Sequence, residues 1–144
     1  MKRLIIILAI GLLAVNFGSC SNGSAKGDEK KSSVNSAIPA SSIQILYFHG
    51  DRRCATCIKV GEVSLNLYNA KYATNTSVAY KEINTDKDEN KAIAEKYQIA
   101  GSSLIIDIKG VVTNITVDAF KYAIADPTKL ESLITDIIEK GLKK

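Results

Sequence analysis

Two cysteines separated by two residues are the clearest candidates for chemistry in this chain. They form the sequence Cys54-Ala55-Thr56-Cys57, and the remaining cysteine is Cys20. A disulfide across so short a loop removes little entropy from the unfolded chain, so the pair is a poor structural brace. We therefore expect thiol–disulfide chemistry, in which Cys54 attacks and Cys57 resolves the mixed disulfide.

The pair falls where a strand pattern gives way to a helix pattern. Residues 43–48 are the apolar run of a buried central strand, and helical spacing of apolar residues extends over 54–73. A sulfur at a helix start meets unpaired backbone N–H groups and the positive end of the helix dipole, which favour a thiolate on Cys54. Arg52 and Arg53 add positive charge beside it.

The remaining patterns predict an α/β fold with a four-stranded mixed sheet and flanking helices, in the order βαβ, α, ββα. A right-handed crossover joins the first two strands, and the short Lys109-Gly110 link makes the last two an antiparallel hairpin. Thr85 or Asp86 is expected to cap the second helix, and Asp126 the third. The later elements are expected at residues 77–84, 90–97, 103–108, 111–117 and from 127 onward.

This order, with the cysteine pair at the first helix start, resembles the thioredoxin superfamily over residues 42–142. Residues 96–106 are similar to the thioredoxin segment in which a helix end leads through a glycine into the third strand. Residues 47–57 are similar to a small exported subgroup, whose members are labelled nitrophenyl compound nitroreductase subunits or arsenic-operon thioredoxin-like proteins. The resemblance implies a thioredoxin-like domain over residues 43–144 that acts through Cys54 and Cys57.

Three departures from the thioredoxin pattern affect the expected site. Ser103, or Ser102 if the loop is one residue shorter, stands where the family has a cis-proline facing the cysteines. We expect a trans bond there, because a cis bond before serine costs about 3–4 kcal/mol. Arg53 replaces the tryptophan that usually precedes the pair. Phe48 replaces the buried acid, so a proton relay to Cys57 needs another group.

His49 is one candidate for that group. It could act as a base or as a metal ligand, although a histidine that closes a strand is more often a loop residue with ordinary hydrogen bonds. With His49 near the dithiol, a module that binds Cu(I) or arsenite is one alternative function. A non-catalytic accessory subunit is another. Structural zinc is disfavoured, because the mature domain offers one histidine and no cysteine beyond the pair.

The N-terminus has the pattern of an export signal. Lys2 and Arg3 precede an apolar run shorter than the roughly 20 residues of a spanning helix, so residues 1–19 are expected to be a signal peptide. Residues 17–20 resemble a bacterial lipobox, which implies a lipid on Cys20. The alternative is an ordinary signal peptide with a coincidental cysteine. Residues 20–42 then form a polar tether, and the domain lies outside the cytoplasm, anchored to a membrane of the bacterial envelope.

Net charge and motif content indicate which classes of partner and cofactor to expect. Without residues 1–19, 17 basic residues (19 less Lys2 and Arg3) face 15 acidic ones, and this net charge of +2 disfavours nucleic acid. There is no flavin or nicotinamide motif, so the only redox group expected is the Cys54–Cys57 disulfide itself. The expected partners are exported proteins or small molecules that carry disulfides or dithiols, and a redox partner protein.

Overall fold

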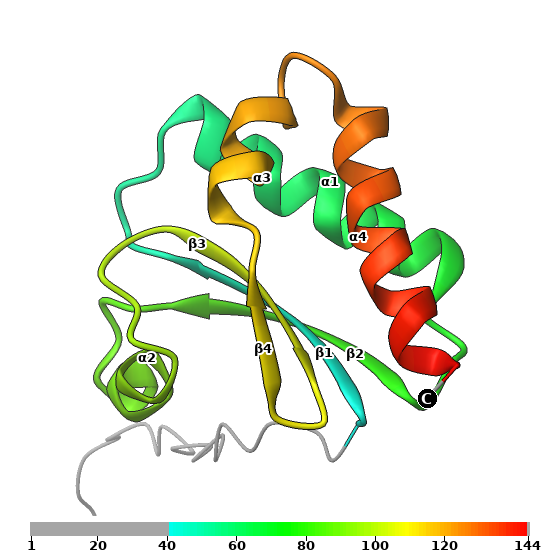
Figure 1. Cartoon of the computed structure of the whole chain (residues 1–144). Coiled ribbons are helices and arrows are strands. Elements are labelled where there is room, and N and C mark those ends of the chain that lie inside the picture. The colour runs from blue at the N-terminus through cyan, green and yellow to red at the C-terminus, as the bar shows by residue number, and fades with distance from the viewer. Residues whose placement is uncertain (1–40, 144) are drawn as a thin grey trace, which may run out of the picture. The chain divides into compact units, whose positions relative to one another are not determined.

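A computed structural model describes residues 41–143 of the chain (Figure 1). The predicted signal peptide, the lipidation site at Cys20 and nearly all of the predicted tether lie outside these residues. The elements are, in chain order, β1 (Ile43–His49), α1 (Ala55–Lys71), β2 (Val78–Asn84), the 3₁₀ helix η1 (Asp88–Asn90), α2 (Lys91–Lys96), β3 (Ser103–Ile108), β4 (Val111–Asn114), α3 (Thr116–Tyr122) and α4 (Pro127–Leu142).

The four strands form one mixed sheet in the order β2-β1-β3-β4. β1 runs parallel to β2 and antiparallel to β3, and β3 pairs antiparallel with β4. The predicted α/β class and the four-stranded mixed sheet are therefore confirmed. β1 is a central strand with a neighbour on each side, as its continuous apolar sequence indicates.

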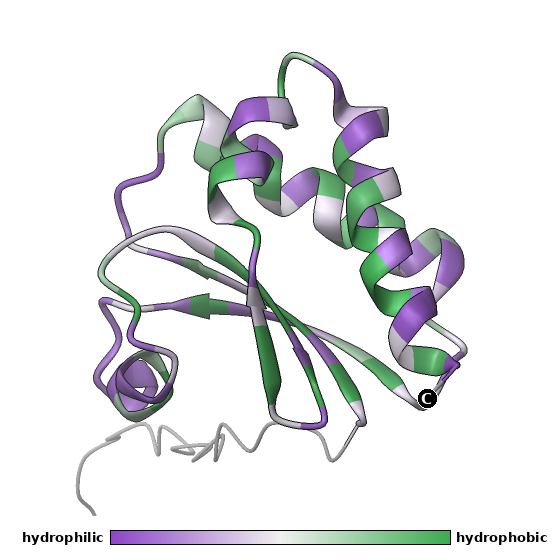
Figure 2. Cartoon of the chain, in the orientation of Figure 1, coloured by the Kyte–Doolittle hydropathy of each residue, from purple (hydrophilic) through white to green (hydrophobic). Residues whose placement is uncertain are grey.

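Alternate residues of β1 face two separate cores, because successive side chains of a strand point to opposite faces. Ile43, Ile45 and Tyr47 belong to the larger core, under α1, α3 and α4. Leu46 and Phe48 belong to a smaller core that α2 covers. Figure 1 shows this division, with three helices over one face of the sheet and α2 alone on the other. In Figure 2 the hydrophobic residues concentrate on the strands and recur from turn to turn along α4.

The last strand was predicted too long, and α3 was missed. β4 ends at Asn114, and a helix begins at Thr116 inside the segment predicted as strand. Ile115, Thr116 and Val117 are β-branched residues that favour strands, but local and tertiary hydrogen bonds override that preference. The Thr116 N–H donates to Asn114 Oδ1 at 3.0 Å, and Leu104 N–H donates to Thr116 Oγ1 at 3.0 Å. These bonds turn the chain into a helix beside the start of β3.

One predicted helix cap is confirmed and the other is wrong. Asp126 caps α4, with its Oδ1 accepting from Lys129 N–H at 3.1 Å and Pro127 in the first turn. Neither Thr85 nor Asp86 caps a helix, because η1 intervenes before α2 and begins after Lys87 without a side-chain cap. Asp86 instead accepts the Asp51 N–H at 2.7 Å.

The cysteine pair and the hairpin turn lie at opposite ends of β1. Its C-terminal residue, His49, leads through a short loop to Cys54, whereas its first residue, Ile43, pairs with Ile108 beside the turn. Lys109 and Gly110 form that turn with φ values of 51° and 89°. A seven-residue strand is about 20 Å long, which sets the approximate separation of the two ends. None of the helices in residues 41–143 combines the length and the apolarity that crossing a bilayer requires.

Candidate functional site

Cys54 is the N-cap residue of α1 and lies in the position predicted for the attacking sulfur. Its backbone is extended, its side chain is exposed, and its Sγ accepts the N–H of Cys57 at 3.1 Å. That N–H is one of the helix-terminal groups that lack a backbone partner. Cys57 lies one turn further on and is buried, and both thiols are free. The Cys54 sulfur is therefore the more accessible of the two from solvent.

The pKa of the Cys57 thiol lies below its ordinary value. Burial raises this pKa, but hydrogen bonds with Cys54 and with the Ser102 hydroxyl lower it by more. A lowered pKa increases the fraction of Cys57 that is thiolate at a given pH, and the thiolate is the reactive form of a cysteine.

The two serines of the loop before β3 differ in their relation to the cysteine pair. The Ser102 side chain is among the groups that lower the pKa of the Cys57 thiol, whereas the Ser103 hydroxyl donates to Gly101 O at 3.1 Å. Ser103 is buried at the start of β3, where it pairs with Phe48. Every peptide bond in residues 41–143 is trans, including the bond before Ser103. Of the two serines, Ser102 is therefore the one that affects the buried thiol.

Tyr47, on β1, contacts the backbone of the cysteine pair. Its hydroxyl donates to the backbone carbonyl of Cys57 at 2.5 Å, and burial raises the pKa of this hydroxyl. The Arg53 guanidinium lies over the Tyr47 ring, with its carbon 5.4 Å from the ring centroid, and its charge partly opposes the rise in this pKa. Tyr47 therefore connects β1 to the first turn of α1, on the residue that carries the buried sulfur.

The absence of a side chain at Gly61 lets Arg53 and Tyr47 pack closely against α1. A Cβ there would lie 2.8 Å from both Arg53 Nη2 and Tyr47 Cε1, closer than real Cβ contacts allow. Glycine in a helix interior is about 1 kcal/mol less favourable than alanine. Its place in α1 is therefore explained by the ring and the guanidinium that lie against it.

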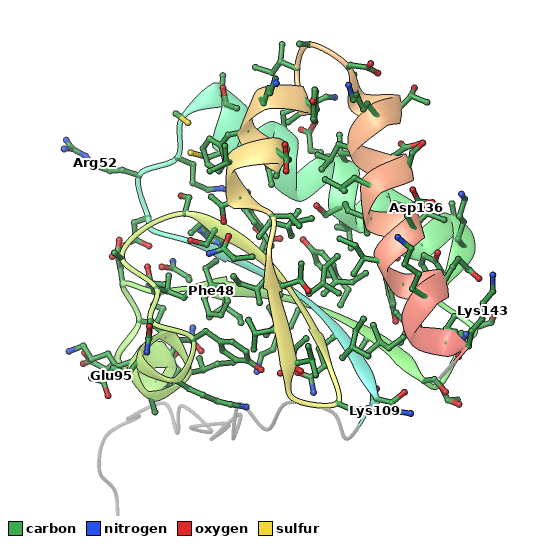
Figure 3. The ribbon with its side chains drawn as sticks, in the orientation of Figure 1. Phe48, Arg52, Glu95, Lys109, Asp136 and Lys143 are labelled. Carbon is green, nitrogen blue, oxygen red and sulfur yellow. The ribbon has the colours of Figure 1, made fainter. Side chains whose placement is uncertain are left out.

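The two arginines point in different directions. Arg53 turns inward, where its Nη1 donates to Glu82 Oε1 of β2 at 2.8 Å. Arg52 is exposed and extends away from the domain (Figure 3). The sequence predicts that both charges act on Cys54, but Glu82 offsets much of the Arg53 charge.

His49 is fixed by two hydrogen bonds. Its Nε2 lies 3.1 Å from Glu82 Oε1, and its Nδ1 lies 2.8 Å from Gly50 O. The ring also stacks on Tyr47, with centroids 5.6 Å apart. Both ring nitrogens therefore lie within hydrogen-bond distance of an oxygen atom, and no contact joins the ring to Cys57 among the described hydrogen bonds.

Glu82, Tyr47 and Gly61 are site residues that sequence reasoning did not identify. The strand register brings Tyr47 opposite Glu82, and a sequence pattern does not specify register. Of these three residues, Gly61 could have been identified from the sequence, because a glycine inside an otherwise continuous helix pattern often has a packing reason. In residues 41–143 no group of three or more histidine, cysteine, aspartate or glutamate side chains is arranged to hold a metal.

No protein-family model and no curated protein matches the chain. Among solved structures, the oxidised thioredoxin of Plasmodium falciparum is 17% identical, with 72% of this chain and 88% of that chain covered and a TM-score of 0.50. Mitochondrial thioredoxin 3 of Saccharomyces cerevisiae is 20% identical, with coverage of 71% and 85% and a TM-score of 0.49. Human ERp44 is 14% identical over 78% of this chain, which spans 30% of ERp44, with a TM-score of 0.51. The fold is thioredoxin-like.

Proposed function

We propose that the chain is a thiol–disulfide oxidoreductase that works through Cys54 and Cys57. The observation that carries the proposal is the placement of the two thiols. Cys54 is exposed at the N-cap of α1 and accepts a backbone N–H, while Cys57 is buried beside it with a lowered pKa. The thioredoxin-like fold supports the proposal, because it carries the pair at the end of a central strand.

In the reducing direction, the Cys54 thiolate attacks one sulfur of a substrate disulfide. A bond forms between Cys54 Sγ and that sulfur, and the other substrate sulfur leaves as a thiolate. The Cys57 thiolate then attacks Cys54 Sγ, and the second substrate sulfur leaves. Two electrons pass to the substrate, and the dithiol becomes the Cys54–Cys57 disulfide. The same steps in reverse oxidise a substrate dithiol.

The residues around the pair support these steps in different ways. The Cys57 N–H stabilises the negative charge on Cys54 Sγ, and the Ser102 hydroxyl does the same for Cys57. Tyr47 fixes the Cys57 carbonyl, so the first turn of α1 keeps its place when the sulfurs change partners. Proteins and small molecules with accessible disulfides or dithiols are the substrates we propose, with a further redox protein to restore the starting state.

Equilibration with glutathione tests the proposal. The Cys54–Cys57 disulfide should form and reduce reversibly, with two electrons per chain, as followed by trapping free thiols at each glutathione ratio. Cys54→Ser should abolish turnover. Cys57→Ser should hold substrates on Cys54 as mixed disulfides, which can be identified after expression in the native host. A pair that stays reduced at every ratio would rule the proposal out.

We also propose that the domain is tethered to a membrane of the cell envelope through a lipid on Cys20, outside the cytoplasm. The support is the sequence alone: a charged start, a short apolar run, and small residues before the cysteine. Metabolic labelling with a fatty acid should mark the wild-type chain and spare Cys20→Ser. Labelling of both chains, or of neither, would contradict the anchor.

A further inference from the structure

The end of the domain opposite the dithiol carries an exposed apolar surface. A groove of about 370 Å³ lies between the β3–β4 hairpin and the last turns of α4, lined by Ile108, Val111 and Ile137. Val111 is 70% exposed and Val112 is 49% exposed. Val111 lines the groove, while Val112, the next residue of β4, points to the opposite face of the sheet. An exposed valine at a hairpin tip, beside an apolar groove, favours contact with something other than water.

Lysines surround this surface. Lys109 and Lys140 line the groove, and exposed Lys143 follows on α4. The exposed acids of this part of α4 are Asp136 and Glu139, and Glu139 faces the other side, where it accepts the Tyr72 hydroxyl at 3.3 Å. The groove itself is lined by no acidic residue. Figure 3 shows Lys109 at the tip of the hairpin, extended away from the sheet.

The N-terminal segment joins the domain at this same end. The Lys109 N–H donates to Ser42 O at 2.8 Å, so the chain enters the sheet beside the hairpin turn. Cys20 precedes Ser42 by 22 residues. At about 3.3–3.6 Å per extended residue, this length lets a lipid on Cys20 sit in a bilayer while the hairpin tip rests on its surface.

We infer that the Lys109–Val112 hairpin tip and its groove form a docking surface for an anionic phospholipid bilayer. Val111 and the apolar rim of the groove enter the boundary between headgroups and acyl chains, and the lysines contact the lipid phosphates. The dithiol, about one strand length away, then faces outward from the membrane. The inference deepens the proposed membrane tether and is independent of the proposed redox chemistry.

A tryptophan reporter tests the surface, because the natural chain has no tryptophan. Val111→Trp is the reporter at the hairpin, and Val117→Trp, at an 82% exposed position on α3 beside the start of β3, is its matched control. Each full-length chain is mixed with vesicles whose acyl chains carry bromine, made of phosphatidylglycerol with phosphatidylethanolamine or of phosphatidylcholine alone. We expect bromine to quench the Val111→Trp fluorescence in the anionic vesicles and to leave Val117→Trp unquenched.

Substitutions that remove a lysine charge then test whether Lys109 and Lys140 contribute to binding of the vesicles. In the Val111→Trp chain, Lys109→Gln and Lys140→Gln should each weaken vesicle binding about fivefold, as should raised salt. Lys91→Gln, which removes a 66% exposed lysine at the start of α2, should have no effect. Equal quenching of both reporters, or quenching unaffected by lipid charge, would overturn the inference. So would burial of Val111→Trp without lipid as the protein concentration rises, since a second copy would then be the occupant.

The two proposals fail separately. A Cys54–Cys57 pair that does not cycle between dithiol and disulfide refutes the oxidoreductase and leaves the quenching result unchanged. A redox-active pair with an unquenched Val111→Trp reporter refutes only the docking surface.

Discussion

One carboxylate oxygen in this protein contacts both an arginine and a histidine. Glu82 Oε1 accepts from Arg53 Nη1 at 2.8 Å and lies 3.1 Å from His49 Nε2. Arg53 continues the chain of contacts to Tyr47, and Tyr47 to the Cys57 carbonyl. The residue before the dithiol is thereby held to β2, and its charge is largely offset before it can act on the sulfurs.

Glu82→Gln should make the dithiol more oxidising. With the carboxylate removed, the Arg53 charge is no longer offset, the thiolate is stabilised, and the equilibrium constant with glutathione should shift by about two- to tenfold. Glu62→Gln is the matched control, because Glu62 pairs with Lys59 on the exposed surface of α1. An unchanged reduction potential in Glu82→Gln would show that Arg53 has no electrostatic influence on the pair.

Gly61→Ala should destabilise the domain, although alanine is ordinarily the better helix residue. The new methyl group would overlap Arg53 and Tyr47, and overpacking of this kind costs about 1–3 kcal/mol. Gly101→Ala is the comparison, since a Cβ at Gly101 meets nothing within 4 Å. Denaturant unfolding measures both variants, and a more stable Gly61→Ala would contradict the packing described for this site.

At the scale of the element, Cys54 is the N-cap of helix α1 in addition to its proposed role as the attacking thiol. Its Sγ caps the Cys57 N–H, so Cys54→Ala should lower the free energy of unfolding of the reduced protein. Cys54→Ser keeps an acceptor at the cap, and we expect it to be about 0.5–1 kcal/mol more stable than Cys54→Ala. Equal stability of the two variants, measured under reducing conditions, would show that the sulfur is not an effective cap.

The lowered pKa of Cys57 predicts a pH dependence for the reduced form. When the folded pKa is below the unfolded one, the unfolded chain binds more protons, so the free energy of unfolding rises with pH. The stabilisation is complete above the ordinary thiol pKa and is lost as the pH falls through the lowered value. Thermal unfolding across this range should show the rise in wild type and a smaller rise in Cys57→Ala. A Cys57→Ala chain with the same slope would mean that another group is responsible.

The elements that position the dithiol could be predicted from sequence because their signals are local. The apolar run of β1 and the Asp126-Pro127 start of α4 are each specified by neighbouring residues. α3 was not predictable in this way, because its start depends on a bond between Thr116 and Leu104. The same holds at the site, where Tyr47 and Glu82 meet only through the register of β1 with β2.

At the scale of the whole molecule, the sheet separates two cores of unequal size. Ile134 on α4 is fully buried in the larger core, and Ile134→Ala should cost about 2–5 kcal/mol. Ile93 on α2 lies in the smaller core and retains some exposure, so Ile93→Ala should cost less. Denaturant unfolding of both variants measures the difference. Equal losses would mean that α2 contributes as much to global stability as the helices on the other face.

β1 is hydrogen-bonded on both sides along most of its length, and it ends where the reactive loop begins. A support of this kind does not have to move when the sulfurs change partners. In the proposed thiol–disulfide exchange, we expect the adjustments to fall on the four residues of the 50–53 loop and on the first turn of α1. Motions of single loops take nanoseconds to microseconds, far faster than rearrangements of whole domains. On such a scaffold, encounter with a partner would limit the rate of the proposed thiol–disulfide exchange, because no rearrangement of the domain has to come first.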